Sequence, residues 1–222
     1  MKQVADGVWQ LKGFPPNGIN VYLVGDVLVD AATRFAGKRI LGQLEGREVS
    51  AHALTHAHPD HQGASKEVCE KLGIPFWVPE RDADAAETPT LIRERQPHKP
   101  INRLIFKAWA GPGHPVDRRL TEGDEVAGFT VLDTPGHSAG HLSLWRESDR
   151  VLILGDVLNS MDVITAIPGL REPKRFFTPD PAENRRSIRR LGQLEPAVAL
   201  FGHGAPVTDT AKFVGFCERV EA

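Results

Sequence analysis

Cysteine is scarce in this sequence. The 222 residues include only two cysteines, Cys69 and Cys217, which lie far apart in segments whose apolar residues have helical spacing. Two isolated cysteines in a chain of this size are typical of reduced core thiols and of a reducing compartment. Neither lies beside the histidine motifs described below, so we expect neither cysteine to bind metal.

Long apolar runs and an excess of charge of one sign are also missing. The longest apolar runs, such as Val151–Leu154, have the length of a strand and are too short to span a bilayer. Residues Met1–Gly7 contain neither a long apolar stretch nor a cleavage-site pattern. The formal net charge of −2 gives no global basic field for nucleic acids or anionic membranes. We therefore expect a cytoplasmic protein that binds neither membranes nor nucleic acids.

Hydrophobic periodicity and turn residues predict an alternation of strands and helices. Strands are expected at 8–11, 20–24, 27–30, 49–55, 75–78, 129–133, 141–145, 151–154 and 197–201, and helices at 35–44, 63–72, 181–194 and 210–220. This order favours an α/β fold in which helices pack on sheets. The hairpins expected at 20–30 and 129–154 argue against an all-parallel sheet.

The length and the absence of a clear linker predict one domain over residues 1–222. Two stretches, 80–115 and 159–179, lack regular periodicity. The first holds five prolines and scattered charges, and we expect it to form an insertion of short helices and loops over one end of the domain.

Four metal-binding side chains are packed into the short segment from His56 to His61. His56 and His58 are alternate residues, so in extended backbone they project in the same direction and can share one metal ion. Pro59 then turns the chain, so Asp60 and His61 can point to a second place a few ångströms away. Imidazole and carboxylate ligands together suit zinc, iron or manganese.

Three more candidate ligands occur in the same structural context. His137 follows the expected strand 129–133, Asp156 follows 151–154, and His203 follows 197–201. The His56–His61 segment likewise follows a strand. Glycine flanks three of these four ligand groups, which allows close approach of the backbone. Because a strand end followed by a turn holds side chains in place, this repeated context predicts one shared site.

The ordered pattern His-Xaa-His-Xaa-Asp-His, Thr-Pro-Gly-His, Gly-Asp and Gly-His-Gly resembles that of the metallo-β-lactamase fold superfamily. It is similar to the branch of glyoxalase II thioesterases and acyl-homoserine lactonases. The resemblance covers nearly the whole chain and implies a four-layer αββα sandwich with a dinuclear metal site at one edge. It implies a first metal held by His56, His58 and His137, and a second held by Asp60, His61 and His203, with Asp156 bridging both.

The resemblance also implies a reaction. Two divalent ions, zinc by preference over iron or manganese, would hold a bridging hydroxide as the nucleophile, polarise the scissile group and stabilise the developing oxyanion. Asp60 and Asp156 are the expected catalytic residues, because Asp60 is placed to orient the attacking water or to take its proton. Asp30 and Asp133 are expected to orient ligand imidazoles by hydrogen bonds.

The leading interpretation is hydrolysis of an ester, thioester or lactone of a small-molecule substrate. One alternative is a mononuclear iron sulfur dioxygenase, similar to persulfide dioxygenases, that would use only His56, His137 and Asp156. A phosphodiesterase of the same fold and a non-catalytic binding module are further alternatives. A homodimer is the family-level expectation for assembly.

Other histidines, arginines and aromatic residues have simpler interpretations. His141 and His52 are expected to be structural, and His98 and His114 to lie at the surface of the insertion. The basic cluster Arg185, Arg186, Arg189 and Arg190 is expected to form the solvated face of a helix. Two interpretations of Phe14, Trp109, Met161, Phe176 and Phe177 stay open, namely an apolar wall over the metals or local packing beneath long loops.

Overall fold

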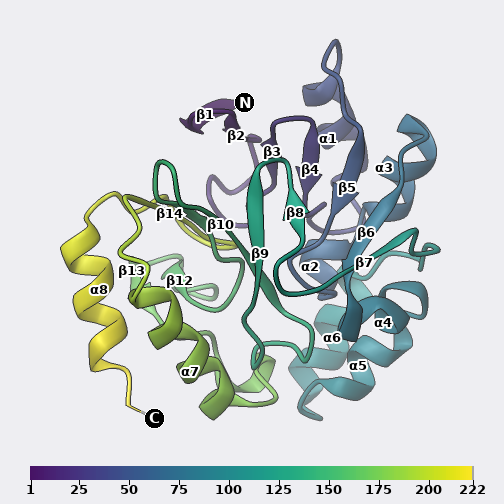
Figure 1. The fold of residues 1–222 in the computed structure, drawn as a ribbon. Helices are drawn as coiled ribbons and strands as arrows, with labels where there is room; N and C mark the ends of the chain where they lie inside the picture. The colour runs from purple at the N-terminus through teal and green to yellow at the C-terminus, as the bar shows by residue number, and fades with distance from the viewer. Residues whose placement is uncertain (222) are drawn as a thin grey trace.

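Two sheets lie face to face between helices in the computed structural model, which describes residues 1–221 (Figure 1). The strands are β1 (Lys2–Ala5), β2 (Val8–Gln10), β3 (Tyr22–Val24), β4 (Val27–Val29), β5 (Ala51–Ala53), β6 (Phe76–Pro79), β7 (Arg118–Leu120), β8 (Glu125–Val126), β9 (Phe129–Asp133), β10 (Leu142–Arg146), β11 (Val151–Ile153), β12 (Asn159–Met161), β13 (Pro168–Arg171) and β14 (Val198–Leu200). The helices are α1 (Gly37–Leu44), α2 (Pro59–Gln62), α3 (Ser65–Leu72), α4 (Ala83–Glu87), α5 (Thr90–Arg95), α6 (Pro100–Trp109), α7 (Pro181–Gly192) and α8 (Thr210–Arg219), with 3₁₀ turns η1 (Glu80–Asp82) and η2 (Arg175–Phe177).

Both large sheets contain parallel and antiparallel strand pairs, as expected from the two predicted hairpins. The first sheet has the order β1-β2-β3-β4-β5-β6-β7, antiparallel from β1 to β4 and parallel from β4 to β7. The second sheet has the order β14-β11-β10-β9-β8, in which β11 and β14 are parallel. Because β10 is antiparallel to both β9 and β11, the strands β9, β11 and β14 all end at the same edge.

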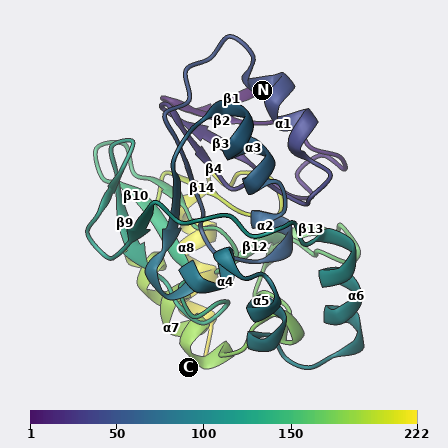
Figure 2. The ribbon, with the colours of Figure 1, turned by 90° about the vertical axis from the view of Figure 1, so that its right-hand side faces the viewer.

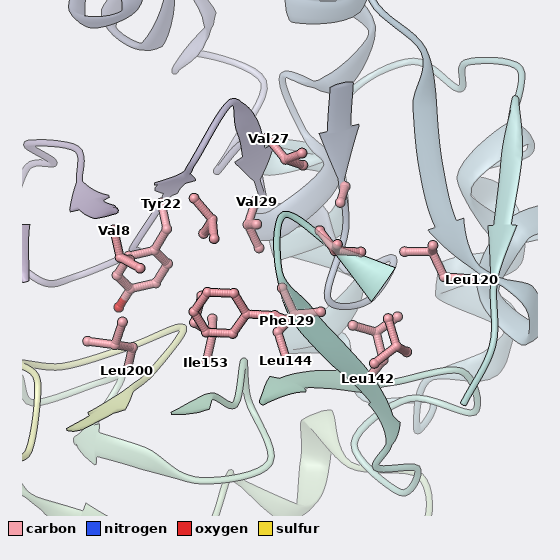
Figure 3. Packing of buried hydrophobic residues seen from close by; sticks show 14 of the residues in the cluster. Val8, Tyr22, Val27, Val29, Leu120, Phe129, Leu142, Leu144, Ile153 and Leu200 are labelled. Carbon is pink, nitrogen blue, oxygen red and sulfur yellow. The ribbon is translucent and has the colours of Figure 1, made fainter. Parts of the chain in front are cut away.

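The main core lies between the two sheets and follows from strand alternation (Figure 3). In β3, Tyr22 and Val24 face the second sheet, whereas Leu23 between them packs on the outer layer. In β11, Ile153 faces the first sheet and Leu152 faces outward. Both faces of β3 and of β11 are therefore buried, which explains why these two strands have continuous apolar runs rather than alternating polarity.

Helices cover the outer face of each sheet and complete four layers. Ile40 and Leu44 of α1 pack with Val68 of α3 over the first sheet. Ile188 of α7 and Phe213 of α8 pack over the second sheet. The expected αββα sandwich is confirmed (Figure 1). Both cysteines are buried free thiols, in α3 and α8.

The structure confirms several predictions about where helices begin and end and about the insertion at 80–115. The side chain of Asp180 accepts a hydrogen bond from the Glu183 N–H and caps α7, whose first residue is Pro181. Gly73 ends α3 with a left-handed φ of +65°, a conformation that costs glycine little. Residues 80–115 form η1 and the short helices α4, α5 and α6, which gather beside α2 at one end of the sandwich (Figure 2).

Other details differ from the prediction. Helix α1 begins at Gly37, and Phe35 is 72% exposed rather than packed in the core. The edge strands β7 and β8 were not expected, because two or three residues are too few for a visible alternation. The stretch 159–179, expected to be irregular, contains the β12–β13 hairpin. No helix within residues 1–221 is long and apolar enough to cross a membrane.

Candidate metal centre

All seven candidate ligands meet at one edge of the sandwich. The loop after β5 and the short helix α2 carry His56, His58, Asp60 and His61, and the loops after β9, β11 and β14 carry His137, Asp156 and His203. The first sheet thus supplies four of these side chains and the second sheet supplies three. Their strands end at the same edge, so residues far apart in sequence are placed together without long flexible connections.

The ligand atoms form three overlapping groups. One is His56, His58 and His137, another is His56, His61 and Asp156, and the third is Asp60, His61 and His203. Within each group the atoms lie within 4.8 Å of one another. The first and third groups are the two sets that the sequence resemblance implied.

Asp156 lies between these groups. Its Oδ2 is 3.5 Å from Nε2 of His61, 3.5 Å from Nε2 of His137 and 3.1 Å from Nε2 of His203. Its Oδ1 is buried and has no hydrogen-bond partner. One carboxylate therefore reaches histidines of both sets, which is the arrangement that a bridging ligand needs.

Unpartnered buried nitrogens indicate that the residues fit a metal ion. Nε2 of His56, His61 and His137 is buried without a hydrogen-bond partner, as is Oδ1 of Asp156. Each such atom costs about 1–3 kcal/mol when it is left unsatisfied. A divalent cation coordinated by these imidazoles and carboxylates would satisfy them together, and the donor set suits zinc, iron or manganese.

The opposite nitrogen of four of these imidazoles is held by the protein. Nδ1 contacts Thr55 Oγ1 in His56, Asp30 Oδ2 in His61, Thr178 Oγ1 in His137 and the Gly18 carbonyl oxygen in His203. These contacts fix the ring orientation and turn Nε2 toward the centre of the cluster.

His58 contacts the protein through its other ring nitrogen. Its Nε2 contacts the side-chain amide of Gln96, the C-cap residue of α5. Among residues 1–221, no hydrogen bond is made by Nδ1 of His58, and this is the nitrogen left for the His56–His58–His137 group. Gln96 was missed at the sequence level, because a single glutamine in the irregular insertion has no motif around it.

Burial and neighbouring charges shift the protonation of the cluster in both directions: His56 and His137 are held neutral, whereas Asp156, against the effect of burial, raises the pKa of His61 and His203. Burial, reinforced by neighbouring imidazoles, holds the pKa of His56 and His137 well below the usual value, so both rings are neutral. Burial opposes ionisation of Asp60, but its hydrogen bond to His203 lowers its pKa to about 2. Burial would likewise lower the pKa of His203, but Asp156 and Asp60 raise it to about 10. Metal binding would therefore release the His203 proton.

Asp30 orients a ring as predicted, whereas Asp133 does not. Asp30 accepts hydrogen bonds from Nδ1 of His61, at 2.8 Å, and from the Thr55 N–H, also at 2.8 Å. Asp133 was predicted to do the same, and this was wrong. No imidazole bonds its carboxylate among residues 1–221, and its backbone N–H and carbonyl oxygen instead bond Glu122 and Arg190 at the surface.

Asp82 takes a supporting role that the sequence did not reveal. Its Oδ2 accepts hydrogen bonds from the Ala57 N–H at 3.0 Å and the Ser138 hydroxyl at 2.7 Å, and its Oδ1 accepts one from the Gly140 N–H at 2.9 Å. This buried carboxylate thus joins the His56–His61 loop to the loop that carries His137. In sequence it lies among charged residues of η1 and resembles a surface acid.

A cavity of about 240 Å³ opens over the cluster. His58, Asp60, His137, Asp156 and His203 line it, and the remaining walls are mostly apolar. Trp109, Phe176 and Phe177 belong to these walls, which supports the first interpretation for three of the five aromatic and methionine residues. Phe14 is instead 96% exposed, and Met161 is buried away from the cavity.

Comparison with known proteins decides the family. Residues 14–203 match the model of the metallo-beta-lactamase superfamily. The chain belongs to the metallo-β-lactamase superfamily. It is an enzyme of that superfamily, whose members bind metal ions, and its histidine and aspartate groups lie where such ions could be held.

Relatives and solved structures of the superfamily cover most of this chain. A probable metallo-hydrolase, YflN of Bacillus subtilis, is 31% identical over 204 residues, covering 82% of this chain and 76% of the relative. The metallo-beta-lactamase family protein TTHA1429 from Thermus thermophilus superposes with a TM-score of 0.70 at 27% identity, over 97% of this chain and 80% of that one. TTHA1623, solved in a di-iron-bound form, gives a TM-score of 0.63 at 26% identity, over 96% and 92% of the two chains.

One similarity concerns a named reaction. A hydroxyacylglutathione hydrolase of Bdellovibrio bacteriovorus is 24% identical over 158 residues, covering 69% of this chain and 48% of the relative. The match thus spans about half the length of that relative.

Most of the remaining histidines and arginines lie as expected, except that His114 and Arg189 are partly buried and Arg189 donates a hydrogen bond to the Val220 carbonyl oxygen. His141 is buried, with Nδ1 on Thr134 Oγ1 and Nε2 accepting the Asp156 N–H. His52 is buried between the Leu28 carbonyl oxygen and the Ser65 hydroxyl. His98 is exposed, and His114 is partly buried beside Phe76. Arg185, Arg186 and Arg190 form ion pairs with Glu172, Glu183 and Glu122.

Proposed function

We propose that the protein is a dinuclear metallo-hydrolase that cleaves an ester, thioester or lactone. His56, His58 and His137 would hold one divalent ion, Asp60, His61 and His203 would hold the second, and Asp156 would serve both. The observation that carries this proposal is the convergence of all seven side chains in one cluster, five of which line the floor of a largely apolar cavity.

When bound, two such ions lower the pKa of a water molecule toward neutrality and polarise the scissile carbonyl group. Zinc is the metal that we propose, although the same ligands suit iron and manganese. Hydrolysis adds the hydroxyl of water to the acyl carbon and delivers its proton to the leaving oxygen or sulfur.

The chain's own residues orient the water and exclude bulk solvent. Asp60 lines the cavity with its carboxylate 3.3 Å from Nε2 of His203, and it is ionised at neutral pH because its pKa lies at about 2. It can therefore orient an attacking water and accept its hydrogen bond. The apolar walls contributed by α5, α6 and the η2 turn reduce the local dielectric, which strengthens electrostatic stabilisation of the transition state.

The preference for acyl substrates rests on the cavity and on one similarity. The walls are mostly apolar, which suits the acyl part of an ester or thioester better than a polyanionic phosphodiester. The resemblance to a hydroxyacylglutathione hydrolase points toward thioester hydrolysis.

Elemental analysis of the purified protein tests the proposal directly. We expect about two zinc ions per chain for the wild type and about one for His203→Ala, together with hydrolysis of at least one member of an ester, thioester and lactone panel. A fully loaded protein that is inert on the whole panel would contradict the proposal. A single iron per chain, unchanged in His203→Ala, would instead favour the oxygen-dependent alternative that uses His56, His137 and Asp156.

A further inference from the structure

Asn20, which lies just before β3 of the first sheet, bonds the loop of the second sheet that carries His203. Asn20 is buried, and its backbone N–H donates a hydrogen bond to the Gly202 carbonyl oxygen at 2.8 Å. Its side-chain Nδ2 donates to the carbonyl oxygens of Phe201 and Gly204, each at 2.8 Å. One residue thus satisfies three of the carbonyl groups that flank this candidate metal ligand.

The residues just before Asn20 bond the same loop. The Gly18 carbonyl oxygen accepts a hydrogen bond from Nδ1 of His203, and the Asn17 carbonyl oxygen accepts one from the Gly204 N–H at 2.8 Å. The segment between β2 and β3 therefore holds both the ring of His203 and the backbone beside it.

Gln10, at the end of β2, fixes the direction of the Asn20 amide. Its Nε2 donates a hydrogen bond to Oδ1 of Asn20 at 2.6 Å, so Nδ2 of Asn20 has to face the His203 loop. Both hydrogens of that Nδ2 are then used by the Phe201 and Gly204 carbonyl oxygens. An aspartate has nearly the same size but donates no hydrogen bond from its ionised side chain, so it could not do the same.

The His203 loop depends on such bonds because it lies beyond the sheet. Strand β14 ends at Leu200, and Gly204 has a φ of +104°, a conformation that glycine adopts but also leaves easily. Nε2 of His203 lies 3.3 Å from Oδ2 of Asp60 and 3.1 Å from Oδ2 of Asp156. Since a metal site tolerates displacements of only about 0.5 Å, a small rotation of this loop would spoil the ligand group.

We propose that Asn20 is the positioning residue for the second metal ion. By fixing the His203 loop it sets the affinity of the group formed by Asp60, His61 and His203, although it does not line the cavity. Within residues 1–221, the hydrogen bonds of Asn20 reach no member of the group that contains His58, so its loss weakens one metal-binding step and spares the other. This inference rests on the proposed dinuclear centre.

Stepwise zinc binding tests the proposal. Asn20→Asp removes both side-chain donors at nearly constant volume. We expect this variant to bind the first zinc ion with wild-type affinity and the second at least about tenfold more weakly, as when another support of a ligating imidazole is lost. Competition with chelators of graded zinc affinity resolves the two steps, and His203→Ala marks the complete loss of the second. Equal weakening of both steps, or a second step of wild-type affinity, would overturn the inference.

Tyr22→Phe is a milder variant that decides the matter if Asn20→Asp does not fold. The Tyr22 hydroxyl is a second donor to the Phe201 carbonyl oxygen, at 2.8 Å, and its removal leaves the bond from Asn20 in place. We expect the second zinc step alone to weaken by about threefold. An unchanged second step in folded Tyr22→Phe would count against the inference.

Ile40→Ala is the control for a general loss of stability. Ile40 is a buried residue of α1 in the apolar layer outside the first sheet, so its truncation leaves a cavity in that layer and keeps every hydrogen bond of the His203 loop. We expect a lower thermal midpoint with both zinc steps at wild-type affinity. Selective weakening of the second step in this variant would show that general destabilisation is a sufficient cause.

Proton NMR of the metal-free protein separates this inference from the proposed function. The Nδ1 proton that His203 shares with the Gly18 carbonyl oxygen is buried, and its downfield resonance is assigned by its loss in His203→Ala. We expect the resonance in the wild type and in Ile40→Ala but not in Asn20→Asp. If the wild type binds fewer than two metal ions and the resonance still disappears in Asn20→Asp, the dinuclear proposal fails while the positioning role stands. If the resonance is missing in the wild type or persists in Asn20→Asp, the positioning role is wrong.

Discussion

Gln96 contacts Nε2 of His58, and it is the only one of the cavity's amide side chains that bonds an imidazole of the cluster within the part of the chain described here. The other four imidazoles of the cluster contact protein groups through Nδ1 instead. A metal ion on Nδ1 of His58 would place the ring proton on Nε2, and a half-turn of the amide then presents its oxygen to that proton. Gln96 therefore links the α5–α6 segment to a candidate ligand.

Removing this link should weaken metal binding. We expect Gln96→Ala to lower the affinity for zinc by about tenfold or more, the range found when the partner of a ligating imidazole is lost. Competition with a chromophoric chelator measures the effect. Glu94→Ala, an exposed change on the same helix, is the control and should bind zinc like the wild type. Equal affinities in all three proteins would show that the contact does not orient His58.

The buried carboxylate of Asp82 should contribute strongly to stability. Asp82→Ala leaves the Ala57 and Gly140 N–H groups and the Ser138 hydroxyl without their acceptor, and we expect a loss of about 3 kcal/mol in the free energy of unfolding. Urea titration followed by circular dichroism measures it.

Asp84, two residues later, provides the comparison. Its ion pair with Arg95 is exposed, so Asp84→Ala should cost less than about 1 kcal/mol. Similar losses for the two variants would mean that the bonds of Asp82 do not hold the two ligand loops together.

Gly202 has no room for a side chain beside Asp156. A Cβ at this position would lie 2.0 Å from Oδ1 of Asp156, so Gly202→Ala must displace that carboxylate or its own loop. We expect at least about a tenfold loss of zinc affinity. Gly42→Ala, in α1, meets no atom within 4 Å and should keep full affinity while gaining roughly 0.5–1 kcal/mol of stability. Normal metal content at limiting zinc in Gly202→Ala would contradict the proposed role of Asp156.

The buried ring of His52 should make stability fall in mild acid. Burial lowers its pKa to about 4 in the folded protein, from 6.5 for the free side chain. The unfolded chain therefore binds the extra proton first, so stability is complete above pH 6.5 and decreases as the pH falls toward 4. The contribution is roughly 3 kcal/mol.

Urea titrations at a series of pH values check this difference. In His52→Gln the free energy of unfolding should lose roughly 3 kcal/mol less than in the wild type between pH 6.5 and 4. His98→Gln changes an exposed ring and should keep the wild-type slope. Parallel curves for His52→Gln and the wild type would show that His52 is not neutral in the folded protein.

The ligand cluster could be predicted because its residue types are rare and its context repeats. His56, His137, Asp156 and His203 each follow a strand, and strand periodicity is visible in the sequence. The αββα layers follow from the same pattern, because strands buried on both faces have continuous apolar runs.

The supporting residues could not be predicted in the same way. Asp133 ends a predicted strand, whereas Asp82 stands beside other charged residues in sequence. Yet Asp82 is the buried one, since Ala57, Ser138 and Gly140 close around it. Gln96 lies in a segment without periodicity, and its contact with His58 depends on how the helices of the insertion fold back over the site. These roles are decided by tertiary contacts between segments far apart in the chain.

The division of the candidate ligands between the two sheets has a consequence for the life of the protein in a cell. Bound metal would join the two sheets at one end of the sandwich, whereas between the sheets they are held mainly by apolar packing. A chain that is starved of metal would open first at that end and expose the loops after β5 and β9 to proteases. Metal supply would then set not only how fast each molecule works but also how long it survives.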